Sequence, residues 1–137
     1  MKSKKIILTL AAMLMATGAC AELRPKTIFV YGFAASFNDS TVYFTDIQQI
    51  DSAYIDSKTK FLYSRENYSY QLRDYLDKLG FKNATCTTSF ANTRKEAEKK
   101  YLALRKKYLE GGKYNINYLK EQDFHYEAIS GKMDVSK

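Results

Sequence analysis

Residues 27–36 read TIFVYGFAAS, a β-prone stretch with apolar side chains at almost every position. In an extended strand the side chains alternate between faces, so one face would carry Ile28, Val30 and Ala34 and the other Phe29, Tyr31 and Phe33. A strand with one face in water would instead alternate apolar with polar residues. The stretch therefore predicts a central strand that is covered on both faces.

A turn and a second β-rich run follow this strand. The turn is Asn38-Asp39-Ser40, whose short polar side chains can bond their own backbone. Residues 41–50 are rich in β-branched and aromatic side chains, so the two runs predict a hairpin. Residues 51–66 place a polar segment between two short apolar groups, which fits either a second hairpin or a loop.

Two amphipathic helices are predicted further along the chain. The first ends at Gly80, because glycine tolerates the left-handed conformation at a helix end, and its apolar stripe is Tyr68, Leu72, Leu76 and Leu79. The second spans residues 93–110 and begins at a capping box of Thr93 and Glu96. Its stripe is Ala97, Tyr101, Leu104 and Tyr108.

Further strands are predicted at residues 84–91, 116–119 and 124–129, which gives the order β-β-α-β-α-β. We expect an α+β fold with one mainly antiparallel sheet and two amphipathic helices packed on one face. A small parallel α/β sheet is the alternative, because residues 84–129 could form a βαβ unit. No Pro- or Gly-rich linker divides the chain, so residues 22–137 are expected to form a single globular α+β domain.

Residues 1–21 have the three-part layout of a secretory signal peptide. Three lysines precede the apolar residues 6–16, and the small-residue site Ala19-Cys20-Ala21 follows. We therefore expect the chain to be exported and to be periplasmic or secreted. The segment around Cys20 is also similar to a bacterial lipobox, and lipidation of Cys20 is the alternative, which would anchor the protein to a membrane.

Removal of residues 1–21 would lower the net charge. The full chain has 22 basic and 15 acidic residues, a net charge of +7, and its first 21 residues hold three Lys and no acid, which leaves +4. A charge of +4 is ordinary for a soluble domain, so we expect no nucleic-acid partner. A membrane partner is expected only if Cys20 is lipidated.

Catalytic and metal-binding patterns are sparse. Residues 22–137 contain one Cys and one His, too few for a structural zinc site, and we expect no metal and no cofactor. Asp46, Asp51 and Asp56 recur at five-residue intervals without an EF-hand loop, so we interpret them as solvated. We expect a protein that is not an enzyme. The alternative is a small enzyme that uses Cys86 and His125 as a thiolate–imidazole pair.

Tyrosine is the most distinctive residue type, and all 12 Tyr and 8 Phe lie after residue 21. Most of these rings are expected in the core and on sheet faces. The predicted binding patch is Tyr63, Arg65, Tyr68 and Tyr70, because this cluster has polar flanks and precedes a helix. The basic face of residues 93–110 is interpreted as solvated, with an anionic envelope polymer or lipid surface as the alternative.

The N-terminal segment followed by GFAASFNDSTVYFTDIQQID, residues 32–51, resembles small secreted proteins of Bacteroides-type bacteria that have no assigned activity. The resemblance implies an envelope protein. The tripeptides Asp39-Ser40-Thr41 and Asp51-Ser52-Ala53 are similar to a motif that is glycosylated in the periplasm of such bacteria, and both could equally be plain turns.

A second resemblance is to SPOR-type peptidoglycan-binding modules, which have a split βαβ plan and an aromatic-Gly-Phe strand. Residues 30–33 (VYGF) and Ser89-Phe90-Ala91 are loosely similar to it, whereas residues 37–66 form a longer insert than that plan contains. We expect an exported, non-catalytic binding or structural module whose partner is an envelope protein or polysaccharide. The resemblance implies a peptidoglycan-binding module as the alternative.

Overall fold

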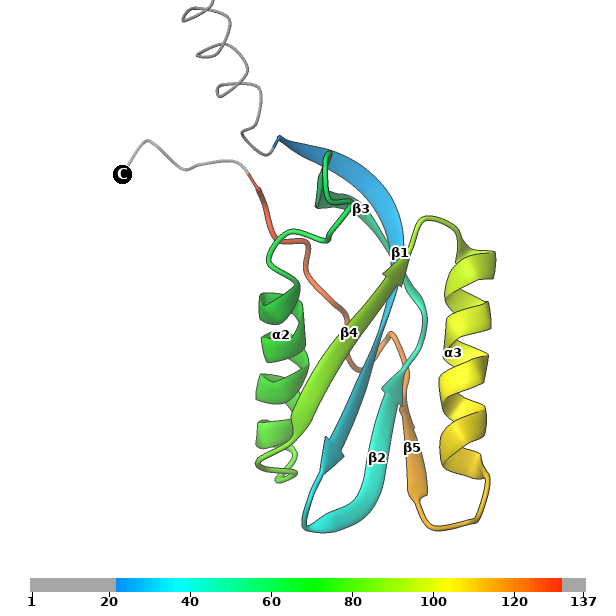
Figure 1. Ribbon diagram of the computed structural model, residues 1–137. Helices are drawn as coiled ribbons and strands as arrows, with labels where there is room; N and C mark the ends of the chain where they lie inside the picture. The colour runs from blue at the N-terminus through cyan, green and yellow to red at the C-terminus, as the bar shows by residue number, and fades with distance from the viewer. Residues whose placement is uncertain (1–21, 132–137) are drawn as a thin grey trace, which may run out of the picture.

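The computed structural model describes residues 22–131, which form one sheet flanked by two helices (Figure 1). The elements in chain order are β1 (Leu23–Ser36), β2 (Asp39–Thr45), β3 (Gln48–Asp56), α2 (Arg65–Lys78), β4 (Thr85–Ala91), α3 (Arg94–Leu109) and β5 (Asn115–Leu119). The α+β prediction is confirmed. The predicted signal peptide, residues 1–21, lies outside the described residues. Within residues 22–131, neither helix is long and apolar enough to cross a bilayer.

β1 is the central strand of the sheet. Phe33 pairs with Phe44 of β2 on one side and with Thr87 of β4 on the other, and Phe29 pairs likewise with Gln49 of β3 and with β4. β2 and β3 therefore follow one another along one edge of β1, and β4 occupies the other edge. β1 is antiparallel to all three, and β5 is parallel to β2, so the prediction of a mainly antiparallel sheet is confirmed.

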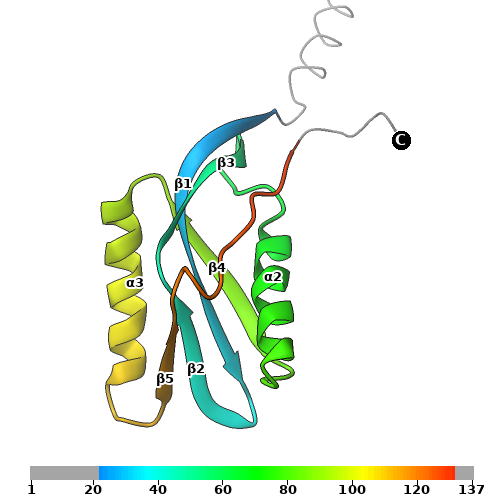
Figure 2. The same cartoon turned by 180° about the vertical axis from the view of Figure 1, so that it is seen from behind.

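The two faces of β1 bury the two side-chain sets that its sequence predicts. On one face, Ile28, Val30 and Ala34 share a core with Tyr68, Leu72 and Leu76 of α2. On the other, Phe33 packs with Phe44 of β2 and with Tyr101, Leu104 and Tyr108 of α3. Figures 1 and 2 show α2 and α3 on opposite sides of the sheet. The doubly covered strand is confirmed, and the prediction that both helices pack on one face is wrong.

The path of the chain explains why the helices separate. From β3 the chain passes through α2 and crosses β1 to reach β4. From β4 it passes through α3 and crosses back over β1 and β2 to reach β5. β2, β3, β4 and β5 all run in the same direction, because β1 is antiparallel to the first three and β5 is parallel to β2. Crossovers between parallel strands are almost always right-handed. Two such crossovers in opposite directions across a sheet place their helices on opposite faces.

The predicted strand 41–50 is interrupted at Asp46 and Ile47, so the observed order is β-β-β-α-β-α-β. Phe33 pairs with Phe44, and Val30 pairs with Gln48. Residues 45–47 therefore face only residues 31 and 32 of β1, which is one residue too many for regular pairing. Within this irregularity the N–H of Gly32 donates to the hydroxyl of Thr45 at 2.8 Å. A β-bulge redirects side chains out of the regular sheet pairing. Here the extra residue leaves Asp46 and Ile47 outside the paired strands.

The predicted strand 124–129 is not a strand but part of residues 120–131, which begin with a turn, continue without regular structure and are called the strap below. Figure 2 shows the strap crossing the sheet beside α2. Side-chain amides hold its backbone: Gln48 bonds the C=O of Phe124 and the N–H of Tyr126, both at 2.8 Å. Gln71 bonds the C=O and N–H of Glu127 at 2.9 and 2.8 Å. These amides take the place of a neighbouring strand.

The helix ends follow the local sequence. Gly80 has a φ of +91°, and the N–H groups of Gly80 and Phe81 bond the C=O groups of Asp77 and Leu76, both at 3.0 Å, as in a Schellman motif. The predicted end of α2 is therefore confirmed, although Leu79 is 57% exposed rather than part of the buried stripe. α3 begins with the predicted cap, in which the N–H of Glu96 donates to the Thr93 hydroxyl at 3.2 Å.

Candidate functional site

A pocket of about 510 Å³ lies beyond the carboxyl ends of β2, β4 and β5. Its lining comes from three separate parts of the chain: the residues after β2, the first turns of α3 after β4, and the start of the strap after β5. In sheets whose helices diverge to opposite faces, ligands bind beyond the carboxyl ends of the parallel strands. The lining residues are Asp46, Ile47, Arg94, Glu98, Tyr101, Leu102 and Glu121.

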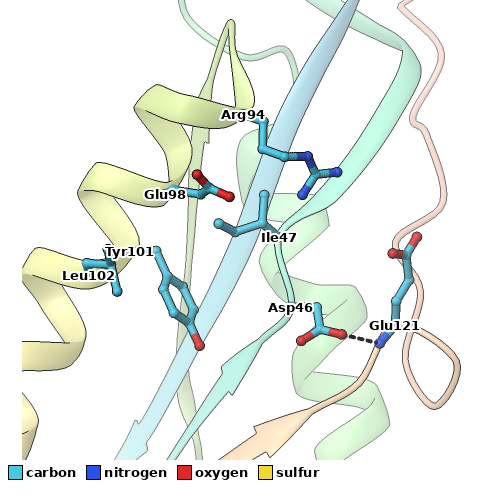
Figure 3. Close-up of a pocket in the computed structure, with 7 residues that line it drawn as sticks. All are labelled: Asp46, Ile47, Arg94, Glu98, Tyr101, Leu102 and Glu121. Carbon is cyan, nitrogen blue, oxygen red and sulfur yellow. Dashed lines mark hydrogen bonds between the residues drawn. The ribbon is translucent and has the colours of Figure 1, made fainter.

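Figure 3 shows Glu98, Tyr101 and Leu102 of α3 on one side of Ile47, and Asp46 with Glu121 on the other side. Arg94 extends over Ile47 between them. The N–H of Glu121 donates to Asp46 Oδ2 at 3.0 Å, and the N–H of Asp46 donates to the C=O of Leu119 at 3.0 Å. These bonds fix the start of the strap against the β2–β3 irregularity. Asp46 therefore positions one wall of the pocket and presents its carboxylate at the surface.

Aromatic rings support the α3 side of the pocket. The Tyr101 ring makes edge-on contacts with Tyr31 and Phe44 at centroid distances of 5.3 and 5.5 Å. Burial raises the pKa of the Tyr101 hydroxyl, so this group stays protonated at neutral pH and can donate a hydrogen bond. The Arg94 guanidinium lies 5.1 Å from the centre of the Phe29 ring, an arrangement that orients a cation at the mouth of the pocket.

Among the charged residues of this pocket the sequence singled out only Asp46, and it was interpreted as solvated. The available signal was the position of Arg94 and Glu121 within three residues of the ends of the predicted strands 84–91 and 116–119, whereas Asp46 lies inside the predicted strand 41–50. The other two carboxylates of the five-residue series lie elsewhere. Asp56 Oδ1 accepts the N–H groups of Lys58 and Thr59, which lower the pKa of Asp56, in a surface turn.

The predicted binding patch does not form one surface. Tyr68 is fully buried, and its hydroxyl accepts the N–H of Ile129 in the strap at 3.0 Å. Arg65 Nε donates to the C=O of Thr88 at 2.7 Å. Tyr63 and Tyr70 are 39% and 44% exposed. The expected exposure of Tyr68 is wrong, because this residue begins the core-facing stripe of α2.

Cys86 and His125 are not brought together. Cys86 lies half-buried beside the core on the α2 face, where burial raises the pKa of its thiol to about 11. His125 is exposed, and its Nε2 lies 3.3 Å from Glu121 Oε2. Among residues 22–131, no hydrogen bond links Cys86 to His125, and no cluster of three or more His, Cys, Asp or Glu side chains could hold a metal ion.

The two predicted glycosylation motifs lie on the surface. Ser40 and Ser52 are both exposed, and Asp39 Oδ1 accepts the N–H of Thr41 at 2.9 Å. Modification of either serine stays a prediction. Comparison of the chain with protein-family models, with curated proteins and with solved structures returns no match.

Proposed function

We propose that the chain is an exported, non-catalytic binding module of the cell envelope, and that it binds a hydroxyl-rich ligand such as a polysaccharide in the pocket beyond β2, β4 and β5. The observation that carries the proposal is the convergence of Asp46, Glu98 and Glu121 with Arg94 from three elements. A sugar hydroxyl can donate to a carboxylate and accept from a guanidinium at the same time. Tyr101 supplies a further hydroxyl beside these charges.

The binding test compares retention of the protein on purified envelope polysaccharide and on peptidoglycan. Glu98→Gln and Arg94→Met each remove one charged hydrogen-bonding group with little change in size. We expect each to weaken binding by about tenfold, because a hydrogen bond to a charged group contributes roughly 1.5–3 kcal/mol. Glu66→Gln is the matched control, since Glu66 lies in the first turn of α2 and outside this pocket.

Unchanged binding of both pocket variants would overturn the assignment of the ligand to this pocket. Retention on peptidoglycan alone, lost in the same variants, would favour the SPOR-like alternative. Retention on neither polymer would contradict the polysaccharide proposal and leave a protein partner as the expected ligand.

A small enzyme that uses Cys86 and His125 is the competing function. A thiolate nucleophile needs a lowered pKa, whereas burial raises that of Cys86 to about 11. At neutral pH its alkylation by iodoacetamide should therefore be about a hundredfold slower than that of an ordinary cysteine, and should accelerate as the pH rises towards 11. Fast alkylation near pH 7 that His125→Ala abolishes would favour the enzyme.

Export has its own test, because residues 1–21 lie outside the described part of the chain. We expect the protein recovered from the envelope fraction to begin at Glu22, which intact mass or N-terminal sequencing would show. A diacylglyceryl mass on Cys20 would instead establish the lipid-anchored alternative. Recovery of the full chain in the cytoplasm would contradict both.

A further inference from the structure

Three turns meet at one end of the molecule: β1–β2, α2–β4 and α3–β5 (Figures 1 and 2). The described termini lie at the other end, where β1 begins and where Gly131 approaches Leu23 and Tyr54. Of the nine exposed large apolar side chains in residues 22–131, four belong to these turns or the helix ends beside them. They are Phe37, Leu79, Leu109 and Tyr114, which we call the apolar tip.

Phe37 is the extreme member of the apolar tip, because its side chain is 100% exposed. It lies in the two-residue turn between β1 and β2, a position that usually carries small polar residues. The Ser36–Asp39 pair closes the turn, and the pairing continues at Ala35–Val42 after an irregularity in the β2 strand. The hairpin pairing therefore holds residue 37 at the tip of the β1–β2 turn, and the Phe37 ring is left in water.

The surface beside Phe37 is partly apolar and continuous with the second helix. Phe37, Tyr108 and Tyr114 line one depression, and the Tyr108 and Tyr114 rings contact each other at a centroid distance of 4.9 Å. Leu109, at the end of α3, is 50% exposed. On the opposite face of the sheet, Leu79 reaches solvent at the same end of the molecule.

Lysines surround the apolar tip. Lys106 and Lys107 lie in the last turn of α3, and Lys113 lies in the α3–β5 turn. Lys78 and Lys82 flank the α2–β4 turn, and the acidic residues of the same region are Asp39, Asp77 and Glu110. Exposed aromatic and aliphatic side chains beside an excess of lysines have the chemistry of a surface that enters the headgroup region of an anionic bilayer.

We propose that the apolar tip is a membrane-contact surface that inserts Phe37 into an anionic lipid bilayer while the surrounding lysines bind the headgroups. The contact needs no lipid on Cys20. It lies at the far end of β1, a strand of 14 residues, and so up to about 45 Å from the point where the described chain begins. The fully exposed Phe37 ring and the excess of lysines over acidic residues beside it favour an anionic bilayer over a protein segment as the partner.

The experiment is co-sedimentation of the processed chain from Glu22 with phosphatidylcholine–phosphatidylglycerol vesicles and with pure phosphatidylcholine vesicles. Residues 22–131 contain the whole sheet, both helices and their cores, so this is the species to test. We expect binding to the anionic vesicles that weakens as salt is added. Phe37→Ser should weaken vesicle binding by about tenfold. The free energy gained when a Phe side chain is buried in an apolar environment corresponds to at least that factor in affinity.

The matched control is Phe61→Ser. Phe61 is 69% exposed but lies beside the turn that bonds Glu22, at the opposite end of the molecule, so its substitution should leave vesicle binding unchanged. The combined substitution of Lys106, Lys107 and Lys113 by Gln should reduce both the salt dependence and the preference for anionic lipid, because only Lys78 and Lys82 remain. Glu98→Gln should bind vesicles normally, which separates this surface from the proposed ligand pocket.

A second measurement does not depend on loss of binding. The chain has no Trp, so Phe37→Trp introduces a single indole at the tip. Its emission should shift to shorter wavelength on addition of anionic vesicles and stay unchanged with neutral ones. No binding to anionic vesicles, an equal loss in Phe61→Ser, or an indole that stays in water would each overturn the proposal. A further outcome would overturn the proposal in favour of a protein partner. In that outcome the parent chain binds no vesicles but captures a protein, and Phe37→Ser no longer captures it.

Discussion

The two faces of the sheet are packed to different degrees. On the α2 face, Tyr68, Leu72 and Leu76 are all fully buried, whereas on the α3 face Tyr101 and Leu104 are only partly buried. The difference comes from the strap, which covers the part of the α2 face that one helix leaves open. Within residues 22–131, α3 is the only element that covers the other face, and the pocket lies beside it. The sealed face therefore supports stability, and the open face is available for binding.

The most damaging single substitution should be Leu72→Ala on the sealed face. Leu72 is fully buried and lies against Gly32 of β1. Truncation of such a Leu costs about 2–5 kcal/mol of the free energy of unfolding. Urea denaturation of the variant and of the parent measures the change. A cost below that of Leu104→Ala would contradict the contrast between the faces.

The second largest effect should come from Gly32→Ala. A Cβ at residue 32 would lie 2.1 Å from the Tyr126 hydroxyl and 2.9 Å from Leu72 Cδ2. Overpacking of this kind costs about 1–3 kcal/mol.

Tyr126→Phe deletes the closer of the two clashing atoms, so it should restore part of the stability lost in Gly32→Ala. A double-mutant cycle measured by thermal unfolding gives this coupling. Strict additivity of the two substitutions would show that the strap does not press against β1.

Leu104→Ala tests the open face. Because Leu104 is only partly buried, we expect a cost of about 1–2 kcal/mol, below the range for a fully enclosed Leu. Leu102→Ala is the control on the same helix, since Leu102 is 55% exposed at the pocket, and it should change stability by no more than about 0.5 kcal/mol. Equal costs at the two positions would mean that the packed side of α3 is wrongly assigned.

The smallest effects should be at the start and on the outer side of α3. Thr93→Ala removes the hydroxyl that accepts the Glu96 N–H and should cost about 1 kcal/mol. Lys100→Ala removes an exposed bond from Lys100 Nζ to the C=O of Phe90, 3.0 Å long, and should cost no more than about 0.5 kcal/mol. If Lys100→Ala proved as damaging as Leu104→Ala, the basic side of α3 would be engaged with a partner.

Local sequence signals predicted the elements that depend on near neighbours. The Gly80 helix end and the Thr93 cap were predicted because their hydrogen bonds join residues at most five positions apart. The buried side of each helix followed from its 3.6-residue period. The strand prediction at 124–129 failed because Gln48 and Gln71, more than fifty positions away, hold this backbone.

Residues 27–36 by themselves determined that β1 would be covered on both faces, since no polar face was left for water. Only the tertiary structure decided which helix covers which face, because that depends on the direction in which each crossover passes over the sheet. The burial of Tyr68 under the strap and the meeting of Asp46 with Glu121, 75 residues apart, were likewise decided there. Periodicity assigns a side chain to a face, but the partner on that face is set by chain topology.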